Sequence, residues 1–349
     1  MALAVRFELY GGPEVLELVD IPRPQAGAGE VVVEVMSAGL NPVDSGIREG
    51  QFKVERPAAF PAGQGSDFAG FVVDVGSTVT GWNVNDAVFG HAFRSAQATF
   101  VAVPAGNVIR RPDGLSWEIA GSLHLAASLA WDAVQGANAA PGRTILVHAA
   151  AGGVGMIAAQ LARLRGARVI GTASPSSFDY LRQRDIIPVE YGPGLEERLA
   201  DIAPGGIDAE LEHFGAGAID IADSVEPTET AVVERIATLV AQHQIVVPIA
   251  AIYPLAQVQD AYRELEAGHA HGKIVLSMVP VEYARQRVLG IYMRETEATM
   301  DDPSHQAGPP AHEVLPPVVG HLPHRMEPRK PGESRAPDAE LPTGAEPTS

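Results

Sequence analysis

Short apolar runs alternate with polar positions through the first third of the chain. Five such runs lie within residues 1–110, separated by glycine, proline and asparagine: ELVDIPRP, EVVVEVMSAG, FAGFVVDVG, DAVFG and ATFVAVP. Alternation with a period of two is typical of strands that bury one face. The spacing of the runs predicts a small antiparallel β-barrel or sandwich over this part of the chain.

From residue 115 onward the apolar positions take helical spacing. Ser116 is expected to cap a helix over residues 117–134. Residues 144–215 then alternate strand, helix and strand, which is typical of a parallel doubly wound sheet. A helix opened by Pro227 and Thr228 follows. The strand IVVPIAAIY, the helix LAQVQDAYRELEAG and the strand KIVLSMV complete the predicted elements.

The segment HAAAGGVG joins a predicted strand to a helix that is expected to start near Val154. Gly152 and Gly153 allow a sharp backbone turn, and Gly155 allows the helix and the strand to approach closely. The free N–H groups and the dipole of the first helical turn then face a pyrophosphate. We therefore predict a dinucleotide site formed by Ala151, Gly152, Gly153, Val154 and Gly155. A turn without a ligand is the alternative.

The residue that closes the second strand indicates which dinucleotide fits. In NAD-binding sites an acid about 20 residues past the glycines binds the ribose hydroxyls. Here the strand ends in GTAS, so Ser174 stands at that place, and Ser176 and Ser177 follow. Hydroxyls without a carboxylate tolerate a 2′-phosphate, so Ser174 and Ser177 favour NADPH over NADH. Arg182 or Arg184 could add positive charge for the 2′-phosphate; the alternative is that each is a solvated helix residue.

Composition narrows the classes of function. The 349 residues suffice for two domains, each with its own core. No apolar run approaches the ~20 residues that span a bilayer, and the N-terminus lacks a secretory apolar segment, so we expect a cytoplasmic protein without a membrane partner. A net charge of −18 argues against a nucleic-acid partner. The absence of cysteine excludes disulfides, thiolate nucleophiles and cysteine-ligated zinc.

Residues 295–349 differ from the rest of the chain. The stretch 303–349 holds 11 prolines and few aromatic or β-branched residues. Such a segment buries too little apolar surface to offset its chain entropy, so we predict disorder. Its four histidines do not predict a metal site, because a flexible segment with irregular spacing preorganises no ligands.

Four segments together carry a family resemblance: SAGLNPVDSGIREG, GQGSDFAGFVVDVG, VHAAAGGVG and YPLAQVQDAYRELEAGHAHGKIVL. With these motifs in this order, the chain resembles the medium-chain dehydrogenase/reductase superfamily, specifically its zinc-independent, quinone-oxidoreductase-like branch. The resemblance implies an α/β protein. A GroES-like β-barrel domain would cover residues 1–120 and 246–280, and a Rossmann NADP-binding domain with a doubly wound parallel sheet would cover residues 121–245.

The resemblance also implies the chemistry of the site. Relatives that bind a catalytic zinc use a cysteine and a His-Glu pair. Asn41 stands at the matching cysteine position, and Ser66 and Asp67 replace the pair, so a site without metal is implied. In this branch NADPH delivers hydride to a quinone or a conjugated carbonyl. Asn41 is implied to donate a hydrogen bond to the substrate carbonyl, whereas Asp44 is interpreted as a turn or cap residue.

Four more residues bear on the cofactor and the substrate cleft: Lys273, Leu129, Ser128 and Gly46. Lys273 of the GKIVL element lies near the cleft, or is a solvated lysine at the end of a strand. Leu129 replaces a threonine that touches the nicotinamide in relatives, and Ser128 beside it is expected to substitute. Gly46 replaces a larger residue that forms a wall of the cleft in relatives.

The largest departure from the family is a gap near residues 225–231. Relatives have a helix, a sheet strand, a nicotinamide-contacting loop and often a dimer-forming strand there, so outer strands of the sheet are missing here. The preceding IDAELE alternates apolar and acidic residues, which is typical of an exposed edge strand. We therefore expect a monomer or a weakened homodimer.

The leading hypothesis is a zinc-independent, NADPH-dependent oxidoreductase that transfers hydride to a quinone, an enone or a similar activated alkene. Apart from NADPH, its only binding partner would be this small-molecule substrate. The alternative is a non-catalytic nucleotide-binding or interaction protein derived from the same fold, because the nicotinamide-side segment is absent. A defective protein that folds poorly is the third possibility.

Overall fold

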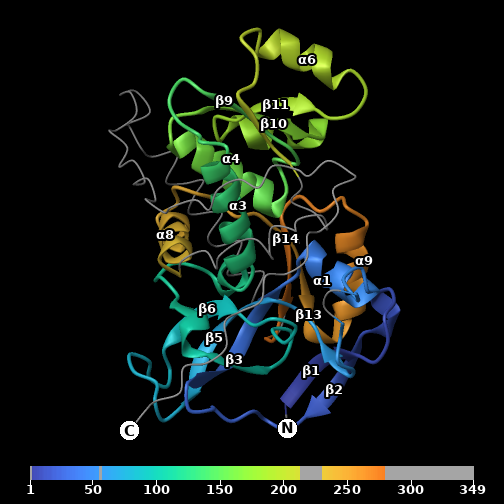
Figure 1. The fold of residues 1–349 in the computed structure, drawn as a ribbon, viewed down its shortest axis with the longest axis vertical. Coiled ribbons are helices and arrows are strands. Elements are labelled where there is room, and N and C mark those ends of the chain that lie inside the picture. The colour runs from blue at the N-terminus through green and yellow to red at the C-terminus, as the bar shows by residue number, and fades with distance from the viewer. Residues whose placement is uncertain (1, 55–56, 213–229, 280–349) are drawn as a thin grey trace, which may run out of the picture. The chain divides into compact units, whose positions relative to one another are not determined.

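The computed structural model describes residues 2–54, 57–212 and 230–279 (Figure 1). The C-terminal segment 295–349, for which we predict disorder, lies outside the described residues, as does most of the gap region. Over the described ranges the chain has the expected α/β fold, with a GroES-like β-domain and a parallel Rossmann-like sheet. The domain boundaries stay a prediction.

Two sheets form the β-rich part, and their strand pairs are antiparallel except for the parallel pair of β13 and β14. Ala2–Phe7 (β1) pairs with Glu17–Ile21 (β2) and with Ala62–Gly63 (β4). A larger sheet has the order β13-β14-β3-β5-β6-β8, with β7 also paired to β3. Its strands are Glu30–Gly39 (β3), Asp67–Val75 (β5), Ala87–His91 (β6), Phe100–Pro104 (β7), Val108–Arg110 (β8), Ile249–Pro254 (β13) and Lys273–Ser277 (β14). The chain therefore returns to the first sheet at its end, as the motif order indicates.

Two apolar clusters hold this part together. Inward side chains of β3 and β5, among them Val33, Val35 and Phe68, form the first cluster. The second joins β1 to β14 and includes Phe7 and Ile274. Each such side chain, fully buried, stabilises the fold by about 1.5–3 kcal/mol relative to its exposed state. These clusters fix β5 and β14, which carry Asp67 and Lys273, and β3, which ends two residues before Asn41.

The NPVD segment begins a helix that the sequence pattern did not predict. Pro42–Glu49 (α1) starts after Asn41 and ends at Gly50, whose φ of 79° lies in the left-handed region. A capping box joins Asn41 and Asp44, and proline stands at the first helical position, where its missing N–H costs nothing. The interpretation of Asp44 as a cap residue is therefore confirmed.

The single helix expected over residues 117–134 is wrong, because the chain forms two. Ser116 caps Trp117–Ala120 (α2) by accepting a hydrogen bond from the N–H of Ile119, as expected. The second helix is His124–Gly136 (α3). Gly121 separates them where the backbone meets β3: a Cβ at this position would lie 2.5 Å from the carbonyl oxygen of Ser37. Packing against β3 therefore interrupts the helix.

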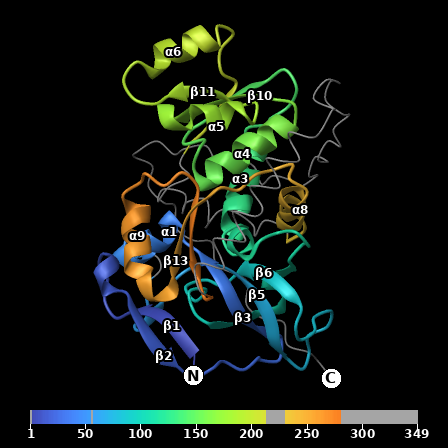
Figure 2. The same ribbon diagram turned by 180° about the vertical axis from the view of Figure 1, so that it is seen from behind.

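The other half of the molecule contains a four-stranded parallel sheet of order β11-β10-β9-β12. Its strands are Thr144–Val147 (β9), Arg168–Ala173 (β10), Ile187–Glu190 (β11) and Ala209–Leu211 (β12). The accompanying helices are Gly153–Leu164 (α4), Phe178–Arg182 (α5), Leu195–Ile202 (α6) and Thr230–Ala241 (α8). Both views show α3 running beside α4 (Figure 2). No helix in the described ranges combines the length and the apolar character that crossing a bilayer requires.

The remaining helical segments complete the fold. They are the long helix Val258–Glu266 (α9) and four 3-10 turns, Pro13–Val15 (η1), Ala105–Asn107 (η2), Pro175–Ser177 (η3) and Leu255–Gln257 (η5). In α9, Val258, Ala261 and Tyr262 are buried, and they pack into the cluster that joins β1 to β14. Helix α9 therefore packs against the side of the barrel that contains β14.

The strand β12 is an edge of the parallel sheet within the part of the chain that the structure describes. It pairs with β9 and with no other described strand. Leu211 is buried, whereas the side chains of Glu210 and Glu212 are 49% and 46% exposed. The Nε2 atom of His148 lies 3.5 Å from a carboxylate oxygen of each glutamate. Among the described strands β12 therefore lies at an edge, whereas residues 213–229, which follow it, lie outside the described residues, so the edge position expected for IDAELE stays a prediction.

Candidate active site

The glycine turn connects β9 to α4, which begins at Gly153, one residue before the expected start. The left-handed residue of the turn is Ala149, with φ of 47°, whereas Gly152 is extended, with φ of −79° and ψ of 175°. The structure therefore corrects the assignment of the sharp turn to Gly152 and Gly153. The N–H of Ala149 donates to Oγ1 of Thr172 at 3.0 Å, which ties the turn to β10.

The glycines serve close approach rather than backbone freedom. A Cβ on Gly155 would collide with the carbonyl oxygen of Ala149, so α4 could not meet the turn as it does. A Cβ on Gly153 would lie 2.5 Å from Cδ of Lys273. The N–H groups of the first turn of α4 have no partner within the helix. An open cradle at a helix N-terminus fits the pyrophosphate of a dinucleotide.

Lys273 leads from this cradle into the barrel. Its side chain passes over Gly153, and its Nζ donates to the carbonyl oxygen of Leu40 at 3.0 Å and to Oδ1 of Asn41 at 2.5 Å. Only 5% of the residue is exposed, so the alternative of a solvated lysine is wrong. Burial lowers the pKa of Lys273, and the nearby carboxyl groups of Asp67 and Asp44 oppose that change.

The amide of Asn41 is held at both ends. Its Oδ1 accepts from Lys273, and its Nδ2 donates to Oδ2 of Asp67 at 3.1 Å. Asp67 is fully buried, and its Oδ1 accepts from the N–H of Leu125 at the start of α3. This arrangement fixes the orientation of the amide and leaves it one N–H for a substrate.

Asp44 lies on the other side of Asn41 and is also buried. Its Oδ2 accepts from the N–H of Asn41 at 3.0 Å, and its Oδ1 accepts from Oγ of Ser66 at 2.8 Å. Burial raises the pKa of Asp44 to about 7, and the charge of Asp67 acts in the same direction, while the bond from Ser66 and the charge of Lys273 oppose it. Asn41, Asp44, Ser66, Asp67 and Lys273 are called the Asn41 cluster below.

The Asn41 cluster does not fit a catalytic zinc ion. Such sites use thiolate, imidazole and carboxylate ligands, and the sequence contains no cysteine. Asn41 stands where the cysteine would be, and the ammonium group of Lys273 already contacts its oxygen. Both oxygens of Asp67 accept hydrogen bonds from the protein. A zinc ion would meet a positive charge at this place.

The serines that are predicted to meet the adenosine ribose follow β10. Ser174 is partly exposed, and its Oγ lies 2.9 Å from Oγ of Ser176. Ser177 is buried, and its Oγ lies 2.9 Å from Nδ1 of His271, in the turn before β14. His271 was missed by the sequence analysis, since the bond joins residues far apart in the chain. Arg182 pairs with Asp179 of its own helix.

Two positions depart from the family pattern: Leu129 in α3, next to Ser128, and Gly46 in α1. Oγ of Ser128 donates to the carbonyl oxygen of His124, within α3, so its expected contact with the nicotinamide stays a prediction. In α1, a Cβ on Gly46 would lie 2.9 Å from Oε1 of Gln51 and 3.0 Å from Cε2 of Phe52. The side chains of Gln51 and Phe52 therefore occupy the space beside Gly46.

Two histidines lie beside the Asn41 cluster. The rings of His91 and His124 are 4.6 Å apart between centroids and inclined by 36°. Burial lowers the pKa of His124 to about 4 and also lowers the pKa of His91, and the charge of Asp67 opposes both changes. Both rings are therefore neutral at pH 7.

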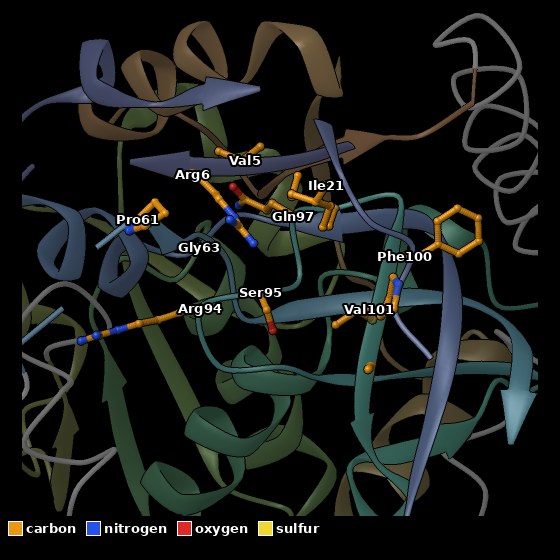
Figure 3. Close-up of a pocket in the computed structure, with 14 residues that line it drawn as sticks. Val5, Arg6, Ile21, Pro61, Gly63, Arg94, Ser95, Gln97, Phe100 and Val101 are labelled. Carbon is orange, nitrogen blue, oxygen red and sulfur yellow. The ribbon is translucent and has the colours of Figure 1, made fainter. Parts of the chain in front are cut away.

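A cavity of about 230 Å³ lies elsewhere in the barrel, next to β1 (Figure 3). Arg6 reaches over it from β1 toward Gln97, while Arg94 points away. None of its lining residues belongs to the Asn41 cluster or to the glycine turn. The chemistry of the cradle and the Asn41 cluster, not the size of this cavity, therefore identifies the candidate site.

Comparison with known proteins shows which proteins the chain resembles. The model of the alcohol dehydrogenase GroES-like domain matches residues 27–122, and the model of the zinc-binding dehydrogenase matches residues 127–276. The quinone oxidoreductase of Pseudomonas aeruginosa is 37% identical over 186 residues, which cover 52% of this chain and 56% of that protein. The matched regions span about half the length of the curated quinone oxidoreductases.

Two further relatives are matched over most of their length. The chloroplastic NADPH-dependent alkenal/one oxidoreductase of Arabidopsis thaliana is 28% identical over 302 residues, and 78% of each chain is covered. The solved structure of the quinone oxidoreductase from Coxiella burnetii is 27% identical, with a TM-score of 0.68 over 80% of this chain and 100% of that chain.

Proposed function

Since the chain belongs to the medium-chain dehydrogenase/reductase superfamily, in its quinone-oxidoreductase-like branch, we propose that it is a zinc-independent reductase. It would use NADPH to reduce a quinone, an enone or a similar activated alkene. The observation that carries this proposal is the side chain of Lys273. This one side chain packs against Gly153 in the proposed dinucleotide cradle and donates a hydrogen bond to the amide of Asn41, which would face the substrate.

The residues of this chain bind and orient the reactants. The N–H groups of Gly153, Val154 and Gly155 face the pyrophosphate, and the dipole of α4 favours its negative charge. Ser174 offers a hydroxyl at the adenosine ribose, where no carboxylate repels a 2′-phosphate. The free N–H of Asn41 donates to the substrate oxygen, where negative charge develops. When bound, the reduced nicotinamide supplies the hydride.

A metal ion has no role in this proposal. The ammonium group of Lys273 and the amide of Asn41 provide the positive charge and the hydrogen-bond donor near the reacting oxygen. A conjugated acceptor is reduced by hydride addition, which needs stabilisation of an oxyanion and no alkoxide bound to a metal. Zinc added after exhaustive chelation is expected to leave turnover unchanged.

The alternative proposal is a protein that binds the nucleotide without turning it over. The observation that favours it is the position of β12, which has no outer neighbour among the described strands. In either case we propose a protein of the cytoplasm that is monomeric or weakly dimeric. Size-exclusion chromatography with light scattering tests the oligomeric state, and a tight dimer at micromolar concentration would contradict it.

Thermal unfolding with NADPH or NADH tests the cofactor. A ligand present at 100 times its Kd stabilises the folded state by about 2.7 kcal/mol. NADPH is expected to raise the Tm more than NADH does, and the variant Gly155→Ala is expected to lose both effects. If neither nucleotide raises the Tm of a cooperatively folded wild-type sample, the reductase proposal is refuted.

A turnover assay then separates the two proposals. NADPH oxidation with 1,4-naphthoquinone, followed by absorbance, is expected for the reductase. Stabilisation by NADPH without any oxidation would instead support the nucleotide-binding protein. An enone acceptor, 2-methylcyclohexenone, extends the assay to the second substrate class.

A further inference from the structure

The Asn41 cluster holds one carboxyl group that hydride transfer does not use. Asp44 is 2% exposed and lies among charged and titratable groups from three other elements. These are Asp67 of β5, Lys273 of β14 and Tyr262 of α9. The hydroxyl of Tyr262 is itself buried and accepts from Nε2 of Gln97 at 2.8 Å, so it is engaged away from the cradle.

Ser66 is the member of the Asn41 cluster that reaches the surface. Asn41, Asp44, Asp67 and Lys273 are each at most 5% exposed, whereas Ser66 is partly exposed. Its hydroxyl lies 2.8 Å from Oδ1 of Asp44. A proton that leaves Asp44 toward a molecule outside the cluster therefore passes through the hydroxyl of Ser66.

We propose that Asp44 and Ser66 form a proton relay that protonates the α-carbon of an enone substrate after hydride has reached its β-carbon. This inference rests on the proposed function. The hydride, which carries both electrons of the reduction, comes from the reduced nicotinamide that the proposed function already supplies. The Ser66 hydroxyl gives its proton to the α-carbon and takes one from the carboxyl group of Asp44, and Asp44 then regains a proton from water.

The protonation state of Asp44 suits this role. Because burial raises the pKa of Asp44 to about 7, the group is divided between its protonated and ionised forms at neutral pH and can both release and regain a proton. His91 and His124 are poor proton donors, since burial lowers both of their pKa values. A positioned acid with a pKa near the working pH accelerates such a step by roughly 10²–10⁴-fold.

The first experiment measures where the proton comes from. The reduction of 2-methylcyclohexenone by NADPH in D₂O places deuterium at the α-carbon and creates a stereocentre there. The wild-type protein is expected to deliver deuterium to one face. Ser66→Ala and Asp44→Asn are expected to lower kcat by roughly 100-fold and to give both faces. The loss is expected to be smaller with 1,4-naphthoquinone, whose product oxygens take protons from water.

Ser45→Ala is the matched control. Ser45 is a buried serine of α1, next to Asp44 in the chain, but its hydroxyl donates to Oε1 of Glu266 at 2.8 Å. This variant is expected to keep the single face of deuteration. Asp44→Asn preserves the size of the side chain and an oxygen that can accept from the N–H of Asn41, so α1 keeps its cap.

The second experiment needs no cofactor. An infrared pH titration of the protein alone is expected to show a protonated carboxyl band that disappears near pH 7 in the wild type. This band should be absent from Asp44→Asn and should change its midpoint in Ser66→Ala, because that variant removes a hydrogen bond to the carboxyl group. A wild-type protein without such a band near neutrality overturns the relay.

The outcomes distinguish the relay from the function on which it rests. If the wild type oxidises NADPH with neither acceptor, the proposed function fails and the relay fails with it. If the wild type reduces the enone and Ser66→Ala still deuterates one face, only the relay is overturned. Reduction of the quinone without any reduction of the enone also overturns only the relay.

Discussion

The contact between Gly153 and Lys273 predicts a specific energetic coupling. In Gly153→Ala, the new Cβ would lie 2.5 Å from Cδ and 3.1 Å from Cγ of the lysine. A real Cβ essentially never comes closer than 3.0 Å to another heavy atom, so the lysine stem must move. Its Nζ is held by Leu40 and Asn41, and the side chain is buried, so little free space receives it.

The expected cost follows from this geometry. Overpacking a well-packed site costs about 1–3 kcal/mol. Unfolding entropy is about 2.1 cal/mol/K per residue, so for a cooperatively unfolding chain of this length each kcal/mol lowers the Tm by about 1–2 °C. Alanine is a better helix former than glycine by up to about 1 kcal/mol, which offsets part of the cost in the single variant. A double-mutant cycle with Lys273→Ala cancels this propensity difference.

Urea unfolding of the wild type, both single variants and the double variant gives the coupling energy. We expect Gly153→Ala to destabilise the wild type but not the Lys273→Ala background, with a coupling of about 1–3 kcal/mol. Gly152→Ala is the matched control, because a Cβ there meets only the carbonyl oxygen of Ala149, at 3.1 Å. An equal cost of Gly153→Ala in both backgrounds would refute the reasoning.

Two further predictions concern buried charge. The folded-state pKa of Asp44 is raised from 3.8 to about 7, so the group binds its proton more tightly in the folded state than in the unfolded state. Its contribution to stability is therefore lost as the pH rises from about 4 to 7. Asp44→Asn should flatten that decline when the midpoint of urea unfolding is measured against pH. Arg48 is fully buried and pairs with Glu266 at 2.7 Å. Glu266→Gln removes the nearer of the two carboxylates that pair with Arg48, and the free energy of unfolding should fall by about 2–3 kcal/mol, less than for a fully buried pair because Glu266 is partly exposed. The control Glu49→Gln, at the exposed neighbour 3.2 Å from Arg48, should cost under about 1 kcal/mol, and an equal cost for both variants would contradict this account.

Local patterns were enough to predict most of the elements. The cap at Ser116 and the order of the strands and helices follow from interactions between residues close in the chain, and the structure confirms them over the described residues. The helix over residues 117–134 failed, because the interruption at Gly121 is imposed by the backbone of β3. The α1 helix was missed, since it is short and holds a glycine and a serine that are typical of turns.

The candidate site was only partly predictable. The cradle at α4 is contiguous in the chain, so its glycines could be recognised from spacing alone. The Asn41 cluster joins α1, β5 and β14, and its bonds connect residues up to 232 positions apart. No local pattern could have shown that Lys273 is buried against Gly153, or that His271 meets Ser177.

The sequence by itself determined the α/β fold and the glycine pattern of the proposed nucleotide cradle, because periodicity and glycine spacing are properties of neighbouring residues. It also determined the absence of cysteine ligands, which the composition shows directly. Only the tertiary structure decided the electrostatics of the site. The pKa of Asp44 and the burial of Lys273 depend on which distant groups exclude water from them. Desolvation is a property of the packed surroundings, and a linear pattern of residues does not contain it.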